Sequence, residues 1–271
     1  MMNKGEGLDF SGRTALVVGA GAGIGEAIVG LLARHGCNVA CVDVDGERAE
    51  AVAGQARHLG VSACAIAANI LDDDEAAGVV ASAQQALGPV DILITVVGST
   101  AFRPLLETSA DDWDKEQQIN LRYVFIVARE FAAARVAAGG GGAICAVASV
   151  SGMMAANRHA PYGAAKAGLM HLVKTMAAEW AVHGIRVNAV APGTIVTPRL
   201  PDTPDWRERV EASPMPMQRR GTVDEIAGPV VFLCSGLASY VTGQTLAVDG
   251  GLTIGNSMAI PAKLKSARPD D

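Results

Sequence analysis

A tyrosine and a lysine four residues apart, Tyr162 and Lys166, are well suited to moving a proton. On a helix, positions i and i+4 lie on one face, so the two side chains would project side by side. A phenol titrates near pH 10 in water, and lowering its pKa by about 3 units requires roughly 4 kcal/mol of preferential stabilisation of the phenolate. A nearby ammonium group supplies part of that stabilisation. The pair therefore predicts general acid/base catalysis by Tyr162.

Ser149 lies 13 residues before Tyr162, just after a strongly apolar segment that is predicted to be a strand. In a doubly wound sheet, the carboxyl ends of the strands form the edge at which ligands bind. The Ser149 hydroxyl is thus placed to hydrogen-bond a substrate carbonyl group. Each residue also has a simpler interpretation: Tyr162 as a partly buried helix aromatic, Lys166 as a solvated residue and Ser149 as a turn residue.

A glycine-rich turn is the second feature with a chemical meaning. Residues 19–25 read Gly-Ala-Gly-Ala-Gly-Ile-Gly and lie between a predicted strand and a predicted helix. Glycines let backbone N–H groups approach a pyrophosphate, and the helix N-terminus adds the positive end of its dipole. The spacing G-x-x-x-G-x-G fits through Gly19, Gly23 and Gly25, whereas G-x-G-x-x-G fits no register. The turn indicates a dinucleotide site, with an ordinary tight turn as the alternative.

Asp43 follows the second predicted strand, 20 residues after Gly23. At this place an acidic side chain can accept hydrogen bonds from an adenosine ribose. The same carboxylate would repel a 2′-phosphate, and Ala22 supplies no positive charge to attract one. The pattern predicts NAD rather than NADP as the cofactor, with a capping or turn role for Asp43 as the alternative.

Apolar, β-branched segments alternate with helical ones along the chain, which is typical of parallel βαβ units. The alternation predicts an α/β fold: a doubly wound sheet of about seven parallel strands with helices on both faces. The predicted strands are 14–18, 38–42, 62–67, 92–96, 142–147, 186–190 and 245–248. The predicted helices are 26–35, 47–59, 73–87, 111–138 and 162–183.

The length of 271 residues, half of them hydrophobic, suits one domain with a large core. We expect a single dinucleotide-binding and catalytic domain over 1–271, with an N-terminal tail at 1–10 and a C-terminal tail at 252–271. The glycine run 139–142 separates a predicted helix from a predicted strand, so it is interpreted as a local loop rather than a domain linker.

Charge and cysteine content exclude several classes of function. The net charge is −6 without a long basic cluster, which argues against a nucleic-acid partner. The five cysteines lack CxxC spacing, so they are interpreted as reduced core residues and no metal site is expected. The N-terminus lacks an apolar signal region, and no segment reaches the roughly 18 to 20 apolar residues of a membrane span. We expect a cytoplasmic enzyme with a small-molecule substrate and no membrane partner.

Together these motifs resemble the short-chain dehydrogenase/reductase family over nearly the whole chain, from residue 12 to residue 251. The matching residues are Gly19-x3-Gly23-Ile24-Gly25, Asn120 in a long helix, Ser149, Tyr162-x3-Lys166, Pro192-Gly193 and Tyr240-Val241-Thr242-Gly243-Gln244. The resemblance implies a Rossmann-type fold and an NAD-preferring oxidoreductase that transfers a hydride between NAD(H) and a secondary alcohol or ketone.

The resemblance also implies a role for each matching residue. Tyr162 would be the general acid/base, Lys166 would lower its pKa and hold the nicotinamide ribose, and Ser149 would orient the substrate. Asn120 would hold a water molecule in a proton relay behind Lys166. The other implied cofactor contacts are Gly19, Gly23, Ile24, Gly25, Asp43, Asn69, Ile70, Gly98, Pro192, Gly193, Ile195 and Thr197.

Three stretches depart from the family pattern. Residues 95–98 read Thr-Val-Val-Gly where relatives usually carry Asn-Asn-Ala-Gly, so Gly98 keeps its close approach while the bracing asparagine side chains are lost. Val18 replaces a usual threonine before the glycine turn. Asn69-Ile70 replaces Asp-Val, and the carbonyl oxygen of Asn69 can still accept a hydrogen bond from the adenine amino group.

Substrate choice is expected to depend on residues 198–221, which carry five prolines, Trp206 and two methionines. This composition predicts a mobile lid over a partly apolar pocket, with an ordered surface helix and loop as the alternative. Met153, Met154, Arg158 and His159 are candidates for the same pocket. Family members commonly form tetramers, which implies a homotetramer here.

Two other functions stay open at this point. One is a 3-oxoacyl-carrier-protein reductase, which would use NADPH. The other is a non-catalytic NAD-binding scaffold, although such a protein has no chemical need for the set Asn120, Ser149, Tyr162 and Lys166.

Overall fold

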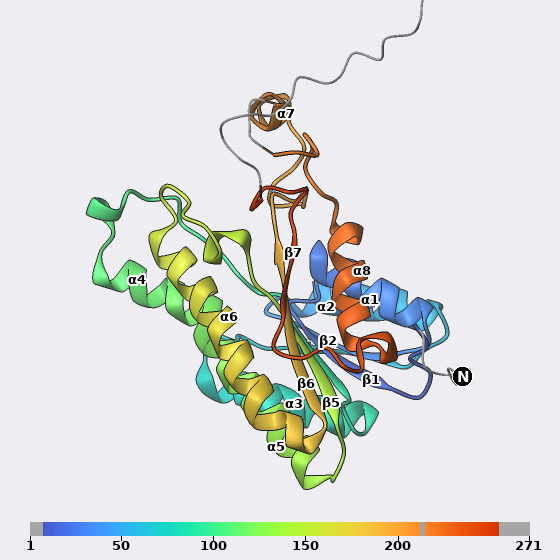
Figure 1. Cartoon of the computed structure of the whole chain (residues 1–271). Coiled ribbons are helices and arrows are strands. Elements are labelled where there is room, and N and C mark those ends of the chain that lie inside the picture. Colours follow the sequence, from blue (N-terminus) through green and yellow to red (C-terminus); the bar gives the residue numbers. More distant parts are fainter. Residues whose placement is uncertain (1–7, 212–214, 255–271) are drawn as a thin grey trace, which may run out of the picture.

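Seven parallel strands form one sheet in the order β3-β2-β1-β4-β5-β6-β7 (Figure 1). The computed structural model of the chain describes residues 8–211 and 215–254. The strands are β1 (Thr14–Val18), β2 (Asn38–Asp43), β3 (Ala63–Ala67), β4 (Ile92–Thr95), β5 (Gly142–Val147), β6 (Ile185–Pro192) and β7 (Thr245–Val248). The predicted single-domain, doubly wound α/β fold of the Rossmann type is confirmed.

Helices cover both faces of the sheet, because the strands are apolar on both sides. In β1, Leu16 and Val18 enter one core cluster, while Ala15 and Val17 enter the other. The first face is covered by α3 (Asp73–Leu87), α5 (Tyr123–Ala137) and α6 (Ala160–Trp180), and the second by α1 (Ile24–Arg34), α2 (Gly46–His58) and α8 (Val223–Cys234).

The strand order reverses direction next to β1, and this reversal creates the place for a ligand. From β1 the chain proceeds to β2 and β3 on one side, and it then returns to place β4 on the other side of β1. The connections that leave β1 and β4 therefore diverge, which opens a crevice outside their carboxyl ends.

Most predicted elements are present, and the differences lie in the helices. The single helix predicted at 111–138 is instead α4 (Ala110–Gln117), a π-helical turn (Gln118–Arg122) and α5. Two helices, α7 (Pro204–Glu211) and α8, lie outside the predicted set. No helix in the described part of the chain is long and apolar enough to cross a bilayer.

The two predicted tails differ in how much of them the structure describes. The predicted N-terminal tail, 1–10, includes one residue that belongs to the folded domain. Phe10 is fully buried in the core, and its N–H donates to the carbonyl of His35 (2.9 Å). Of the C-terminal tail at 252–271, residues 255–271 lie outside the described part of the chain.

A tyrosine braces the end of β4, where the family's usual asparagines are missing. Tyr123 of α5 is 2% exposed, and its hydroxyl donates to the carbonyl of Val97 (2.8 Å). This bond ties the loop after β4 to the helix layer beneath it.

We expect Tyr123→Phe to lower the free energy of unfolding by about 1 kcal/mol, because the partly buried carbonyl of Val97 loses its donor. Urea denaturation would measure the change. Tyr240→Phe is the matched control, since Tyr240 is fully exposed and its hydroxyl braces no buried group. Equal effects of the two substitutions would contradict the bracing role.

Candidate active site

Several of the predicted site residues lie along one edge of the sheet, because they follow or end parallel strands at their carboxyl ends. Gly19 follows β1, Asp43 ends β2, Gly98 follows β4 and Ser149 follows β5. Asn69 and Ile70 follow β3, and Pro192 ends β6. The fold thus gathers residues that are more than 150 positions apart in the sequence.

Tyr162 and Lys166 lie in the first two turns of α6, as their spacing predicts. The ammonium nitrogen of Lys166 is 5.7 Å from the centroid of the Tyr162 ring. The Lys166 side chain is buried, and Nζ donates to the carbonyl of Val147 at the end of β5 (2.9 Å). The Ser149 hydroxyl, two residues after that carbonyl, lies close enough to the Tyr162 phenol to oppose the rise in its pKa. The three predicted catalytic side chains are therefore neighbours.

Burial dominates the electrostatics of this pair. It raises the pKa of Tyr162 above its usual value, and the hydrogen bond from Ser149 opposes this only in part. It also lowers the pKa of Lys166 to about 8. Desolvation thus opposes the partial stabilisation of the phenolate that the Lys166 ammonium group is expected to give. A further positive charge is needed to favour the phenolate.

Asn120 lies in the middle of the π-helical turn and is completely buried. Its amide nitrogen donates to the carbonyl of Ser99 (2.7 Å), and its Oδ1 accepts from the Ser99 N–H (3.1 Å). A Cβ atom added to Gly98 would lie 3.0 Å from that Oδ1 and 3.1 Å from the Lys166 ammonium nitrogen. Asn120 is therefore beside Lys166, where a relay residue would need to be.

The glycine turn offers unpaired N–H groups to an anion. Gly23 precedes α1 with φ 63°, in the left-handed region that favours glycine, and no side chain caps this helix. A Cβ on Gly25 would lie 1.9 Å from the carbonyl oxygen of Gly19, so Gly25 is required for packing of the turn itself. An uncapped helix N-terminus suits a pyrophosphate, so these residues fit the dinucleotide that their spacing predicts.

Asp43 is held in place by three contacts. Its carboxylate accepts from the N–H of Gly21 (3.0 Å) and of Asp45 (3.1 Å), and it forms an ion pair with Arg48 (3.1 Å). Arg48 also pairs with Asp45 (3.0 Å). The cation nearest to Asp43 is therefore neutralised by two carboxylates.

The residues after β3 and β6 have structural partners of their own. Asn69 Oδ1 accepts from the N–H of Leu71 (3.2 Å), and Ile70 is buried. A Cβ on Gly193 would lie 2.8 Å from Cα of Asp249, so glycine is needed there for close packing. Ile195 is buried, and Thr197 Oγ1 accepts from the N–H of Leu200 (3.1 Å).

Arg199 is a candidate residue that the sequence reasoning missed. Its guanidinium donates to Ser99 Oγ (3.0 Å) and to the carbonyl of Gly98 (3.4 Å). Because β5 separates β4 from β6, this side chain crosses the carboxyl end of β5 near Ser149. A Cβ on Gly23 would lie 3.5 Å from Cδ of Pro198, so the same segment also reaches the glycine turn.

The predicted lid contains α7 and is fixed at its base by Arg220, a buried residue that donates to the carbonyl of Pro201 (3.0 Å). Residues 212–214 lie outside the described part of the chain. Of the predicted pocket residues, His159 has its ring centroid 5.8 Å from that of Tyr162. Met153 and Met154 are exposed in the loop after Ser149, and Arg158 is exposed as well.

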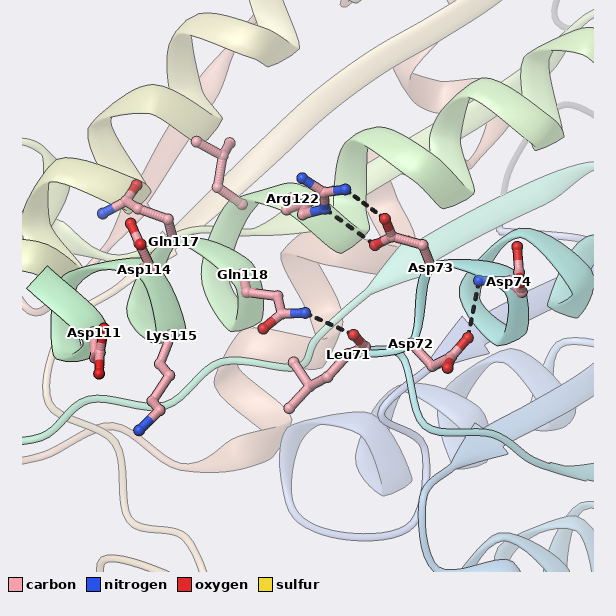
Figure 2. A pocket seen from close by; sticks show the side chains of 11 residues that line it. Leu71, Asp72, Asp73, Asp74, Asp111, Asp114, Lys115, Gln117, Gln118 and Arg122 are labelled. Carbon is pink, nitrogen blue, oxygen red and sulfur yellow. Dashed lines mark hydrogen bonds and ion pairs between the residues drawn. The ribbon is translucent and has the colours of Figure 1, made fainter.

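A separate pocket lies on the outer side of α4 and the π-helical turn and shares no residue with the catalytic cluster (Figure 2). In it Arg122 pairs with Asp73, and the side chain of Gln118 donates to the carbonyl of Leu71 (2.6 Å). Five aspartates line it: Asp72, Asp73, Asp74, Asp111 and Asp114. Within the described residues, no cluster of three or more His, Cys, Asp or Glu side chains could hold a metal ion.

Comparison with known proteins agrees with this geometry. A family model described as enoyl-(acyl carrier protein) reductase matches residues 19–253. The chain is 36% identical to L-rhamnose 1-dehydrogenase (NAD(P)(+)) of Sphingomonas sp. (strain SKA58), covering 90% of this chain and 98% of that relative. It is 35% identical to the 3-oxoacyl-acyl-carrier-protein reductase of Thermotoga maritima, covering 90% and 99%.

Among solved structures, the fold is similar to that of 7α-hydroxysteroid dehydrogenase complexed with NADH and 7-oxo glycochenodeoxycholic acid. The TM-score is 0.87 at 32% sequence identity, covering 93% of this chain and 98% of that chain.

Burying Lys166 has a predictable effect on stability. Because its pKa is lower in the folded protein than in the unfolded chain, the unfolded chain binds more protons between about pH 8 and pH 10.5. The buried Lys166 therefore lowers the stability of the folded protein by its full amount below pH 8, and this cost disappears as the pH rises through 10.5.

We expect Lys166→Met to raise the free energy of unfolding at pH 7 by about 2 kcal/mol, after the lost hydrogen bond to Val147 is subtracted. The advantage should shrink at pH 10. Urea denaturation at the two pH values would measure it, with Lys174→Met, an exposed site on the same helix, as the control. A variant that is less stable than the wild type at pH 7 would contradict the assignment.

Proposed function

The chain belongs to the short-chain dehydrogenase/reductase family, and from that premise we propose that it is an NAD-dependent enzyme acting on a secondary alcohol or ketone. Hydride transfer between a nicotinamide cofactor and an alcohol or ketone is the reaction of this family. The proposal is carried by one arrangement: Ser149, Tyr162 and Lys166 lie together at the sheet edge that also bears the uncapped N-terminus of α1.

In the proposed reduction, the Tyr162 hydroxyl donates its proton to the substrate carbonyl oxygen as that oxygen gains negative charge. In the reverse direction, the phenolate accepts the proton of the alcohol. The Ser149 hydroxyl orients the same oxygen by a hydrogen bond. When bound, the nicotinamide supplies or accepts the hydride, and its oxidised form adds the positive charge that the pKa of Tyr162 requires.

Lys166 favours the phenolate through its charge and donates hydrogen bonds to the nicotinamide ribose in this proposal. One of its N–H groups is used on the carbonyl of Val147, and an ammonium group has three. Asn120 lies behind it as the residue that would hold a relay water.

The contacts of Asp43 support NAD as the preferred cofactor. A 2′-phosphate would meet the carboxylate of Asp43, and the adjacent Arg48 is already paired with both Asp43 and Asp45. The repulsion is therefore not offset by a free cation at this place.

The other proposed cofactor contacts follow the order of the strands. The turn of Gly19, Gly23, Ile24 and Gly25 would hold the pyrophosphate, and Asn69, Ile70 and Gly98 would contact the adenosine. The stretch Pro192, Gly193, Ile195 and Thr197 would contact the nicotinamide carboxamide and the phosphates.

A second candidate function is the NADPH-dependent reduction of a 3-oxoacyl group, which the 35% identity to the Thermotoga maritima reductase favours. The Asp43 carboxylate argues against it. The compared proteins also include a sugar dehydrogenase and a steroid dehydrogenase. They support a substrate that carries a secondary hydroxyl group on a larger carbon skeleton, which the 198–221 lid would cover.

We also propose a homotetramer located in the cytoplasm. The edge strand β7 exposes Leu246 and helix α5 exposes Phe125, so apolar groups are available for contact with other copies. The molar mass in solution would decide the assembly. The cytoplasmic location fits the five cysteines, none of which forms a disulfide.

We expect Tyr162→Phe to lower kcat by about 10²- to 10⁴-fold, because the substrate oxygen loses its proton donor. NADH absorbance with a panel of secondary alcohols and ketones would measure turnover. NADH affinity should be retained, and measuring it separates a loss of chemistry from a loss of folding. Undiminished turnover in this variant would end the catalytic assignment.

We expect the wild type to prefer NADH over NADPH in kcat/KM, and Asp43→Asn to shift that ratio toward NADPH by about tenfold or more. The substitution removes the repelling charge and one of the two carboxylates that pair with Arg48, which leaves more of its positive charge for a phosphate. Adding Arg48→Met to Asp43→Asn should cancel the gain with NADPH. A wild-type preference for NADPH would instead favour the 3-oxoacyl reductase.

A further inference from the structure

One carboxyl group lies buried close to the catalytic side chains without an opposite charge to balance it. Glu116, in the last turn of α4, is 8% exposed, and it is the only buried Asp or Glu residue in the described part of the chain. None of the ion pairs formed by the described residues involves it. Burying an unpaired acid is costly, so its position calls for a physical explanation.

Two hydrogen-bond donors meet the Glu116 carboxyl group, one at each oxygen. The N–H of Ala101 donates to Oε1 (2.6 Å), and the amide nitrogen of Asn120 donates to Oε2 (3.1 Å). A carboxylate accepts at both oxygens, whereas a protonated carboxyl group must place its own O–H at one of them. The two contacts therefore favour the ionised form of Glu116, while burial disfavours it.

These bonds hold the loop that lies next to Lys166. The side chain of Asn120 hydrogen-bonds both the backbone N–H and the backbone carbonyl of Ser99. The Glu116 carboxyl group accepts from the N–H of Ala101, two residues further along the chain. Gly98 begins the same loop, in contact range of the Lys166 ammonium group. Two side chains one helical turn apart thus hold Ser99 and Ala101, the second and fourth residues of the loop 98–101.

We propose that Glu116 is a positioning residue for the reaction: its carboxylate fixes the Asn120 amide and the 98–101 loop beside Lys166, and its protonation releases them. This inference rests on the proposed function. Glu116 touches neither substrate nor cofactor in this scheme, and it acts through Asn120 and the loop.

The charged and titratable groups around Glu116 determine the direction of the pH effect. The negative charge of Asp112, on the same helix, raises the pKa of Glu116. The negative charge of Glu116 in turn raises the pKa of Tyr162 on α6. Arg103 is engaged by Asp112, Lys166 is bonded to Val147, and Arg199 is bonded to Ser99. Burial, the largest influence, raises the pKa of Glu116 above its usual value.

The sign of the effect on activity follows from that shift. The working form is the carboxylate, and because the pKa is raised, this form is lost at a higher pH than for an exposed glutamate. Turnover should therefore fall as the pH is lowered through the raised pKa. Because a raised pKa means that the folded protein binds this proton more tightly than the unfolded chain does, acidification through that pKa stabilises the fold, and the loss of activity is not caused by unfolding through Glu116.

Glu116→Gln tests the proposal, because a glutamine side chain has the same shape but only one accepting end. It cannot accept from both Ala101 and Asn120, so one bond is lost at every pH. We expect kcat to fall about tenfold and the acid limb that Glu116 contributes to the pH profile of kcat to disappear. Asp114→Asn, an exposed site on the same helix, should keep both kcat and the acid limb.

A residue with only a structural role would lower the melting temperature of the variant without changing the shape of its pH profile. An unchanged kcat together with an unchanged acid limb in Glu116→Gln would overturn the proposal.

Hydrogen exchange of the wild type gives a readout that needs neither a variant nor turnover. The protection factor of the segment 98–102 should fall when the pH is lowered from 8 to 5, while that of β5 stays constant. Constant protection of 98–102 would overturn the role of Glu116 even if the enzyme is active. A protein that turns over no alcohol or ketone but shows the pH-dependent protection would overturn the proposed function instead.

Discussion

The burial of a charged lysine next to a tyrosine is the interaction on which the rest of the site depends. The Lys166 ammonium group is removed from water when the protein folds, and one protein hydrogen bond, to the carbonyl of Val147, replaces part of its hydration. Its desolvation has to be offset by packing elsewhere, and the two apolar clusters on the faces of the sheet supply that packing. Since the lysine is fixed to β5 and the tyrosine lies one turn away, α6 cannot shift along the sheet without disturbing both.

Polar contacts at the carboxyl edge serve mainly to hold loops in position. Asp43 holds the glycine turn through Gly21, Tyr123 holds the loop after β4 through Val97, and Asn120 holds the same loop through Ser99. Each of these side chains comes from a different element. The loops of this edge are thereby anchored to the rigid layers beneath them, which is what precise placement of a substrate requires.

The strands and the side-by-side placement of the candidate catalytic side chains could be predicted from the sequence, because both depend on local signals. Apolar runs indicate strands directly, and the spacing of Tyr162 and Lys166 indicates one helix face. Helix α8 is hard to predict from the sequence, because the prolines of the preceding segment indicate a loop; the capping box of Thr222 and Glu225 is the signal that marks its start. Glu116 was missed because it lies in a stretch, 111–118, that is polar except for Trp113, and there only the fold distinguishes a buried acid from exposed ones. The contacts of Arg199 were missed because they join the segments after β6 and β4, which are about 100 residues apart in the sequence and separated in the sheet by β5.

The π-helical turn at 118–122 has a geometric consequence for this chain. A π turn carries one residue more than an α turn, and each residue of a helix adds about 100° of rotation. The helix before it and the helix after it are therefore out of phase. This offset lets α4 present aspartates outward while α5 directs apolar side chains onto the sheet. Removing one residue from this turn would make α4 and α5 one continuous helix. The faces of α4 would then be rotated by about 100° relative to α5, and Glu116 would point away from Ala101.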